Sequence, residues 1–185
     1  MVAIISLCKH RLHEEEFVKP VVEIARKVAD IEITRVSEDV DNRKIRKRHK
    51  GAIVCGTALK DFDYLQKDFS WLLDFEFVLG ICAGYQVLAR LFSANISRIE
   101  RIGVHEVICK RENPLFEGRF RAYFLHELAL SIKDVLDVFE VLAVCENEVA
   151  AFKVKSKEFY GVSFHPEVLS PEIIEKFVEL SSERS

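Results

Sequence analysis

The chain has 185 residues, of which 49% are hydrophobic and 31% charged, and its formal net charge is −3. This composition is typical of one globular domain, and it excludes collagen-like and low-complexity chains. The small negative charge argues against bulk electrostatic binding of nucleic acid, and no apolar run approaches the ~18–20 residues of a membrane span. We therefore expect a single domain over residues 1–185, located in the cytoplasm, with neither nucleic acid nor a membrane as partner.

The first half of the chain alternates short apolar runs with longer stretches of helical periodicity. Strands are expected at Val2–Ser6, Ile31–Val36, Ala52–Cys55 and Phe77–Ile81, and amphipathic helices at Glu14–Ala29, Asp61–Phe75 and Ala83–Ser93. This strand–helix order predicts parallel strands that are joined by helical crossovers.

The second half is dominated by strand-like runs with little room for helices between them. Such runs cover Ile99–Lys110, Arg119–Leu125, Val138–Cys145, Val149–Val154 and Phe159–Phe164. A turn is expected at residues 113–118, and a closing helix from Pro171 to about Ser181. Together the two halves predict a three-layer α/β fold, in which helices cover both faces of a central, mostly parallel sheet with antiparallel additions.

A run of basic residues, Arg43–Lys50, precedes the third expected strand. It is either a docking patch for an acidic partner or a phosphate-bearing ligand, or a solvated surface segment. The acids Glu38, Asp39 and Asp41 partly offset its charge. The sequence leaves both interpretations open.

Cys82 stands apart from the other four cysteines because of its neighbours. The odd cysteine count and the lack of a Cys-x-x-Cys pair argue against a disulfide framework and a structural zinc site. Gly80 and Gly84 flank Cys82 in a G-x-C-x-G pattern between an expected strand and an expected helix. This is the setting of a nucleophile elbow, where the helix N-terminus favours a thiolate. A buried cysteine beside helix-packing glycines is the alternative.

A second feature, His165-Pro166-Glu167, follows the last expected strand. Residues two apart in extended backbone project to the same side, and Pro166 biases His165 toward that conformation. The Glu167 carboxylate can then hold one imidazole nitrogen of His165 while the other faces a thiol. This is the arrangement of nucleophile, base and orienting group that acyl-transfer sites use.

The segments from Val78 to Gln86 and from Tyr160 to Val168 resemble the elbow and triad segments of the class I glutamine amidotransferases. The resemblance implies the flavodoxin-like fold of that family and covers essentially the whole chain. It also implies that Cys82 is the nucleophile, His165 the general base and acid, and Glu167 the group that orients the imidazole. The elbow glutamine of the family, Gln86, would help to hold the amino-acid end of the substrate.

The resemblance further implies an oxyanion hole and a substrate-binding strand edge. Ala83 N–H would be one oxyanion donor, and Gly56 N–H, in the turn after the third strand, the other. That turn reads Cys55-Gly56-Thr57 where the family usually carries Gly-Gly-Pro, which makes a conformational activation step plausible. Backbone groups at Leu125 and His126 match the substrate-binding edge, although His126 also fits a plain surface residue.

These residues imply glutamine hydrolysis through a γ-glutamyl thioester on Cys82, with no metal or organic cofactor. Relatives of this length supply ammonia to a synthetase subunit on a separate chain. In length and layout the sequence is similar to the glutaminase subunits of two-chain GMP synthetases, although residues 6–10 depart from their usual Asp-Asn-Gly-Gly-Gln. The alternatives are a γ-glutamyl peptide or conjugate hydrolase, which needs a wider pocket, and a non-catalytic regulatory module with the same fold.

Overall fold

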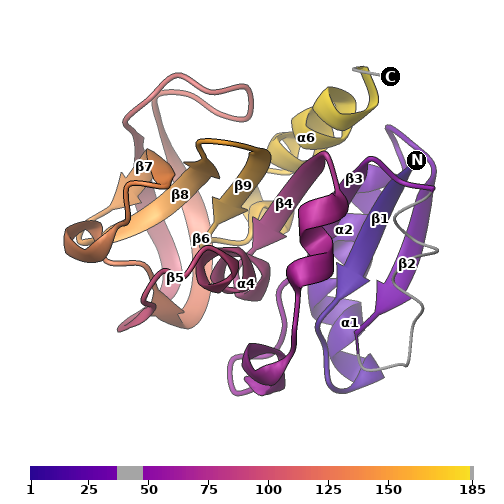
Figure 1. The fold of residues 1–185 in the computed structure, drawn as a ribbon, viewed down its shortest axis with the longest axis horizontal. Coiled ribbons are helices and arrows are strands. Elements are labelled where there is room, and N and C mark those ends of the chain that lie inside the picture. The colour runs from indigo at the N-terminus through magenta and orange to yellow at the C-terminus, as the bar shows by residue number, and fades with distance from the viewer. Residues whose placement is uncertain (37–47, 184–185) are drawn as a thin grey trace.

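A computed structural model describes residues 1–36 and 48–183, so most of the basic run lies outside the described residues. Among the described residues, one nine-stranded sheet has the strand order β2-β1-β3-β4-β9-β8-β7-β5-β6 (Figure 1). Its strands are β1 (Val2–Ser6), β2 (Ile31–Arg35), β3 (Gly51–Val54), β4 (Phe77–Ile81), β5 (Ser97–Cys109), β6 (Arg119–Ala129), β7 (Phe139–Cys145), β8 (Glu148–Val154) and β9 (Glu158–Val162). The helices are α1 (Arg11–Phe17), α2 (Lys19–Ala25), α4 (Ala83–Leu91), α5 (Pro166–Leu169) and α6 (Glu172–Glu183), with short 3-10 helices η1 (Asp63–Gln66), η2 (Ser70–Asp74) and η3 (Ile132–Asp134).

The sheet has a parallel part and an antiparallel part. Strands β2, β1, β3, β4 and β9 pair in parallel. From β9 outward, β8, β7, β5 and β6 pair antiparallel. The α/β fold and the antiparallel additions expected from the second half of the sequence are therefore confirmed.

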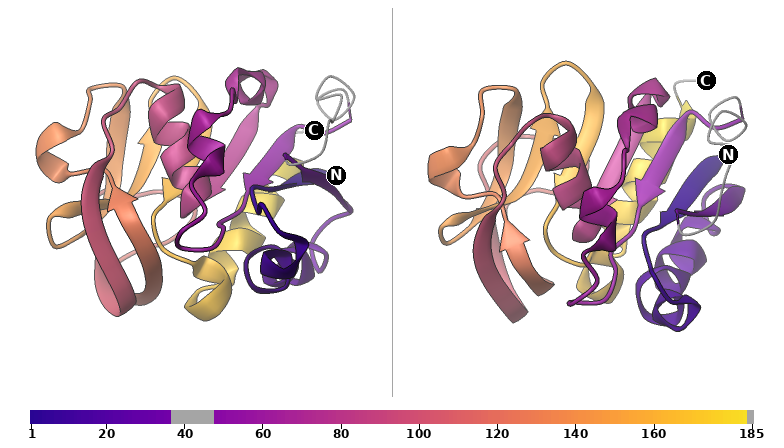
Figure 2. Two further views of the ribbon diagram at one scale, coloured as in Figure 1. Left: turned by 90° about the horizontal axis from the view of Figure 1, so that it is seen from below. Right: turned by 60° about the horizontal axis from the view of Figure 1, so that its bottom comes forward.

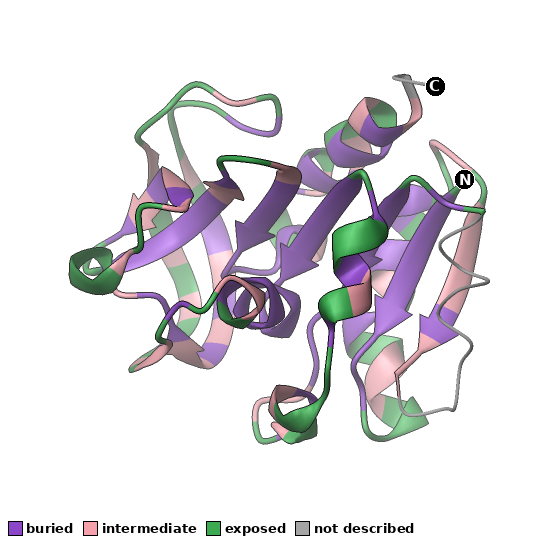
Figure 3. Cartoon of the chain, in the orientation of Figure 1, coloured by how far each residue is buried: buried purple, intermediate pink, exposed green. Residues whose placement is uncertain are grey.

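Side chains of the parallel strands alternate between two apolar layers, as the two-residue period of a strand requires. In β1, Val2 and Ile4 pack into the layer that contains α2 and α6. Ala3 and Ile5 point the other way, into the layer that contains α4. Figure 2 shows helices on both sides of the sheet, and Figure 3 shows that the central strands are buried along their length.

The helix expected over Glu14–Ala29 is wrong in its extent, because the structure has two short helices there. α1 begins earlier, at Arg11, and α2 starts at Lys19 with Pro20 in its first turn. Proline has no N–H to donate to the preceding turn and its ring clashes with a continuing helix, so the chain starts a new helix at this point.

The amphipathic helix expected over Asp61–Phe75 is also wrong, because this stretch forms η1 and η2 instead. Between them, the Asp68 carboxylate accepts hydrogen bonds from the backbone N–H and the hydroxyl of Ser70. Such a local side-chain bond competes with helical pairing of the backbone. Phe69 and Leu72 of this segment still face the core, whereas Leu73 is exposed.

The remaining expected elements are confirmed, with small shifts at their ends. β4 has the predicted bounds, and β5 and β6 are longer than predicted because they pair along a two-stranded ribbon. Within the described part of the chain, no helix has both the length and the apolar character needed to cross a membrane.

Candidate active site

The predicted catalytic residues lie at the carboxyl ends of the parallel strands, where ligands of open α/β sheets bind. Cys82 follows β4 directly, and Gly56 lies two residues beyond β3. His165 lies three residues beyond β9, which is the neighbour of β4 in the sheet. Residues that are far apart in the sequence thus meet at one edge.

Cys82 adopts a strained elbow between β4 and α4. Its φ of 51° and ψ of −101° lie outside the helical and extended regions. A methyl group on Gly80 would lie 2.4 Å from the carbonyl oxygen of Gly84, and one on Gly84 would lie 2.1 Å from that of Val54. Both contacts are with backbone, so the two glycines are what lets the strand and the helix pass so closely.

His165 and Glu167 form the expected pair. Nδ1 of His165 lies 2.7 Å from Oε1 of Glu167, and both side chains are 2% exposed. The backbone of His165 is extended, with φ −104° and ψ 91°, and its N–H donates to the carbonyl of Tyr123 on β6. The other ring nitrogen, Nε2, is buried without an oxygen or nitrogen partner among the described residues, which leaves it available to a thiol.

The electrostatics of the pair favour a charged imidazole. Burial alone would lower the pKa of His165, but the charges of Cys82 and Glu167 raise it well above its ordinary value. The site therefore favours the charged form of His165 beside Cys82 and Glu167, an arrangement that suits a cysteine nucleophile.

The two predicted oxyanion donors come from the elbow and from the turn after β3. Ala83 is the first residue of α4, so its N–H belongs to the free N-terminal turn of a helix. Gly56 lies against the catalytic groups: a methyl group placed there would be 2.8 Å from Cε1 of His165 and 3.5 Å from Cβ of Cys82. The Gly56 carbonyl accepts a long hydrogen bond from Sγ of Cys8, at 3.9 Å.

A small cavity of about 10 Å³ lies beside Cys82. Five of the predicted site residues line it: Cys82, Ala83, Gln86, Leu125 and His126. The thiol of Cys82 lies 3.5 Å from the Leu125 carbonyl. The rest of the wall comes from Glu127 and from residues of the segment from Thr57 to Tyr64. A cavity of this volume holds about one water, so a larger substrate requires it to widen.

Gln86 lies in this wall with both ends of its amide bonded. Its Oε1 accepts a 2.5 Å hydrogen bond from the Tyr64 hydroxyl, and its Nε2 donates to the Leu128 carbonyl at 2.9 Å. Burial, together with the charges of Cys82 and Asp61, raises the pKa of Tyr64, so its hydroxyl remains a donor. The orientation of the Gln86 amide is therefore fixed, and its remaining hydrogen and lone pair stay available.

The surface interpretation of His126 is wrong, because the residue is only 2% exposed. Its Nδ1 lies 3.2 Å from the Ser163 carbonyl and its Nε2 3.3 Å from the Glu148 carboxylate. Glu148 also accepts hydrogen bonds from Arg101 and from the Ser163 hydroxyl. This buried network ties β6 to the strand end that carries His165.

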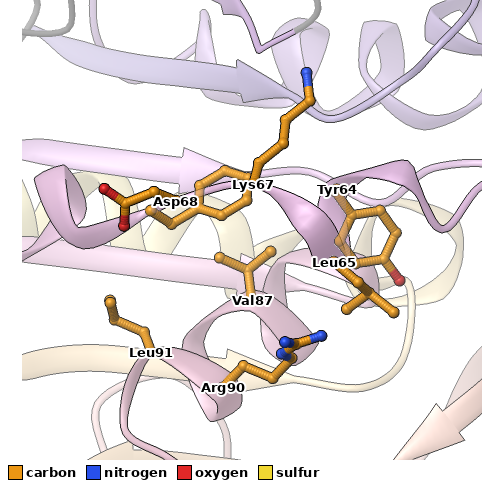
Figure 4. A pocket seen from close by; sticks show the side chains of 8 residues that line it. Tyr64, Leu65, Lys67, Asp68, Val87, Arg90 and Leu91 are labelled. Atoms are coloured by element: carbon orange, nitrogen blue, oxygen red, sulfur yellow. The ribbon is translucent and has the colours of Figure 1, made fainter.

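Two larger pockets lie away from the catalytic groups. One, of about 240 Å³, lies between η1 and α4 and is lined by Leu65, Arg90 and Leu91 among others (Figure 4). The other, of about 260 Å³, includes Lys9 and His10 in its lining. Neither is lined by Cys82 or His165, so their size does not make them the reaction site.

Sequence reasoning missed the part of the wall that follows the turn after β3. Thr57, Asp61 and Tyr64 all line the cavity beside Cys82. One signal for them was available: loops that follow the carboxyl ends of parallel strands surround the ligand.

Comparisons with known proteins agree with the geometry. The family model described as "Glutamine amidotransferase class-I" matches residues 14–179. A glutamine-hydrolyzing GMP synthase subunit from Methanococcus maripaludis strain C5 is 39% identical over 99 residues, which are 49% of this chain and 50% of the relative. The protein of the same name from Methanocaldococcus jannaschii is 37% identical over 103 residues, covering 51% and 53% of the two chains. Each match thus covers about half the length of the relative.

Solved structures share the fold over the whole chain. A Thermoplasma acidophilum protein, described provisionally as a GMP synthase subunit, has a TM-score of 0.81, covering 100% of this chain and 96% of that one at 21% identity. A glutamine amidotransferase from Thermotoga maritima has a TM-score of 0.65 at 15% identity, covering 99% and 92%. At identities of 21% and 15%, the similarity shows a shared fold and no more.

Proposed function

The chain belongs to the class I glutamine amidotransferase family, whose model matches residues 14–179, and on that premise we propose that it hydrolyses L-glutamine to glutamate and ammonia. The observation that carries the proposal is the meeting of the Cys82 elbow with the His165–Glu167 pair at neighbouring strand ends. A non-catalytic module has no need of a strained cysteine or of a buried imidazolium.

In the first half of the reaction, the Cys82 thiolate attacks the side-chain carboxamide carbon of glutamine. The negative charge that develops on the amide oxygen is stabilised by the N–H groups of Ala83 and Gly56. His165 donates its proton to the departing nitrogen, which leaves as ammonia. The product on the enzyme is a γ-glutamyl thioester of Cys82.

In the second half, neutral His165 removes a proton from water, which attacks the thioester carbon. The carbon–sulfur bond breaks, glutamate leaves, and the Cys82 thiolate and the imidazolium are restored. Glu167 keeps its hydrogen bond to Nδ1 throughout, so that Nε2 faces the reacting atoms. Gln86, Leu125 and His126 line the cavity in which the amino-acid part of the substrate binds.

The relatives, rather than the cavity, support glutamine over the γ-glutamyl peptide or conjugate alternative, because a space of about 10 Å³ must widen for either substrate. The relatives that are 35–39% identical are each named as a glutamine-hydrolyzing subunit of GMP synthase. We therefore propose the synthetase subunit of GMP synthase, on a separate chain, as the acceptor of the ammonia.

The test is ammonia release from L-glutamine by the purified chain, with and without the synthetase subunit of GMP synthase, for wild type and Cys82→Ser. We expect release from wild type in at least one condition and none from Cys82→Ser. Cys109→Ser serves as the matched control and should keep the wild-type rate. Absence of ammonia from wild type in both conditions would overturn the proposal.

Covalent labelling provides an independent readout. A diazo-ketone analogue of glutamine should attach to Cys82 and to no other cysteine. Burial raises the pKa of Cys145 to about 11 and also raises that of Cys8 and Cys55, so these thiols stay protonated at neutral pH. Mass spectrometry that located the label mainly on Cys8 or Cys145 would contradict the assignment of the nucleophile.

A further inference from the structure

The two carboxylate oxygens of Asp61 differ in their hydrogen bonding: one is bonded to neighbouring loops, and the other has no partner among the described residues. The residue is 8% exposed. Its Oδ2 accepts hydrogen bonds from the backbone N–H of Lys9 at 2.8 Å and from the Thr57 hydroxyl at 2.9 Å. Its Oδ1 is buried and has no partner among the described residues. An unpaired buried oxygen is costly, so its presence calls for an explanation.

Asp61 is one of the residues that line the cavity beside Cys82. Two carboxylates line that cavity, those of Asp61 and Glu127. Glu127 is already paired with Lys60. Among the described residues that line the cavity, Asp61 is therefore the carboxylate with a buried oxygen that has no partner.

Asp61 borders two spaces, and the charges around them favour a cation in the cavity beside Cys82 over one in the larger pocket. Asp61 also borders the pocket of about 260 Å³, where Lys9 and Lys60 offset the charges of Asp61 and Asp63. A further positive group is therefore favoured less in that pocket than beside Cys82. The cavity beside Cys82 has no lysine or arginine among the described residues of its lining.

We propose that Asp61 binds the α-ammonium group of glutamine through Oδ1 and thereby selects an α-amino acid amide as substrate. The inference rests on the proposed glutaminase function and assigns a specificity-determining residue to it. The bonds from Lys9 and Thr57 hold Asp61 to the base of the segment, and the carboxamide end of the substrate lies at Cys82. A charge-assisted hydrogen bond of this kind contributes about 10- to 100-fold to binding.

The experiment compares two substrates, L-glutamine and glutaramate, the same acid amide without the α-amino group. Ammonia release is measured for wild type, Asp61→Asn and the control Asp63→Asn, each in the condition that gives wild-type activity. Asn retains an oxygen that can accept from Lys9 and Thr57, so the change removes mainly the charge. Asp63 lies two residues away, pairs with Lys9 at 2.8 Å and does not line the cavity.

We expect Asp61→Asn to lower kcat/KM for glutamine about 10- to 100-fold, chiefly by raising KM, and to leave kcat/KM for glutaramate within about twofold of wild type. The ratio of the two values does not depend on the folded fraction of the sample. Asp63→Asn should keep the wild-type ratio.

Two results would overturn the inference, and they are distinguishable. If wild type hydrolyses glutamine but Asp61→Asn changes both substrates alike, Asp61 is a structural residue and the proposed function stands. If wild type releases no ammonia from glutamine in any condition, the proposed function fails and the inference falls with it.

Discussion

Gly84 in the elbow and Gly56 in the turn after β3 both lie beside Cys82, but an added methyl group would meet different neighbours at the two positions. At Gly84 it would lie 2.1 Å from the backbone oxygen of Val54 in β3. At Gly56 it would lie 2.8 Å from the imidazole of His165. Neither glycine has a positive φ, so space rather than backbone conformation requires it.

The difference separates the requirements of the fold from those of the chemistry. Gly84 lets α4 approach β3, so its effect is exerted on the packing of the sheet. Gly56 leaves room for the ring that Glu167 orients, so its effect is exerted on the position of the general base. Substitutions at the two glycines, and then at residues around them, can break or refine this separation.

Gly56→Ala should reduce kcat for glutamine by about 10²-fold or more, while the melting temperature changes little. The new methyl group displaces the His165 ring, and a misplacement of about 1 Å can cost that much in rate. Steady-state kinetics and a thermal melt on the same sample provide the measurement. A variant that turned over at the wild-type rate would show that the imidazole does not depend on this space.

Gly84→Ala should instead destabilise the protein. Overpacking against an immovable backbone group typically costs about 1–3 kcal/mol, which for a chain of this size lowers the melting temperature by about 2–12 °C. Calorimetry or circular dichroism checks the shift, with Gly56→Ala as the contrast. An unchanged melting temperature would mean that the elbow can relax away from β3, and the comparison would fail.

The sequence predicted the elements whose pattern admits one interpretation. β4 is a short apolar run between turn signals, and the glycines at positions 80 and 84 mark the elbow that follows it. The His165–Glu167 contact was predictable because extended backbone and Pro166 restrict the geometry locally. In each case the information lies within a few residues.

The parts that were not predictable depend on contacts distant in the sequence. His126 is buried against a polar network of Glu148 and Arg101, which lie on other strands. The 3-10 helices replaced a helix because Asp68 bonds to the backbone of Ser70, an alternative that the apolar spacing does not reveal. Asp61 is held in the cavity wall by hydrogen bonds from Lys9 and Thr57, and these bonds connect the loops after β1 and β3.

Glu167→Gln should shift the alkaline limb of kcat/KM to lower pH by about 1–3 units. The Glu167 charge favours the imidazolium, so its removal lowers the pKa of His165, and the proton needed by the leaving ammonia is lost at lower pH. The pH–rate profile of the free enzyme measures this shift. The exposed Glu172, changed to Gln, is the control and should leave the limb in place. If the alkaline limb did not move in Glu167→Gln, the limb would report the titration of a group other than His165.

Lys60→Ala should have the smallest effect, and in the opposite direction: kcat/KM for glutamine should rise by up to about fivefold. Lys60 pairs with Glu127, which lines the cavity, and the pair links the segment after Gly56 to β6. Since its side chain is 74% exposed, the pair contributes only about 0.2–1 kcal/mol to the closed arrangement. Loss of the pair lowers the free-energy cost of widening the cavity for glutamine by that amount. The elbow is unaffected. Lys155→Ala breaks the exposed pair with Asp137 and should leave kcat/KM unchanged. Added salt should also raise the wild-type value toward that of Lys60→Ala, because it screens the same charges. A decrease in kcat/KM for Lys60→Ala would instead show that the closed segment is the form that binds glutamine.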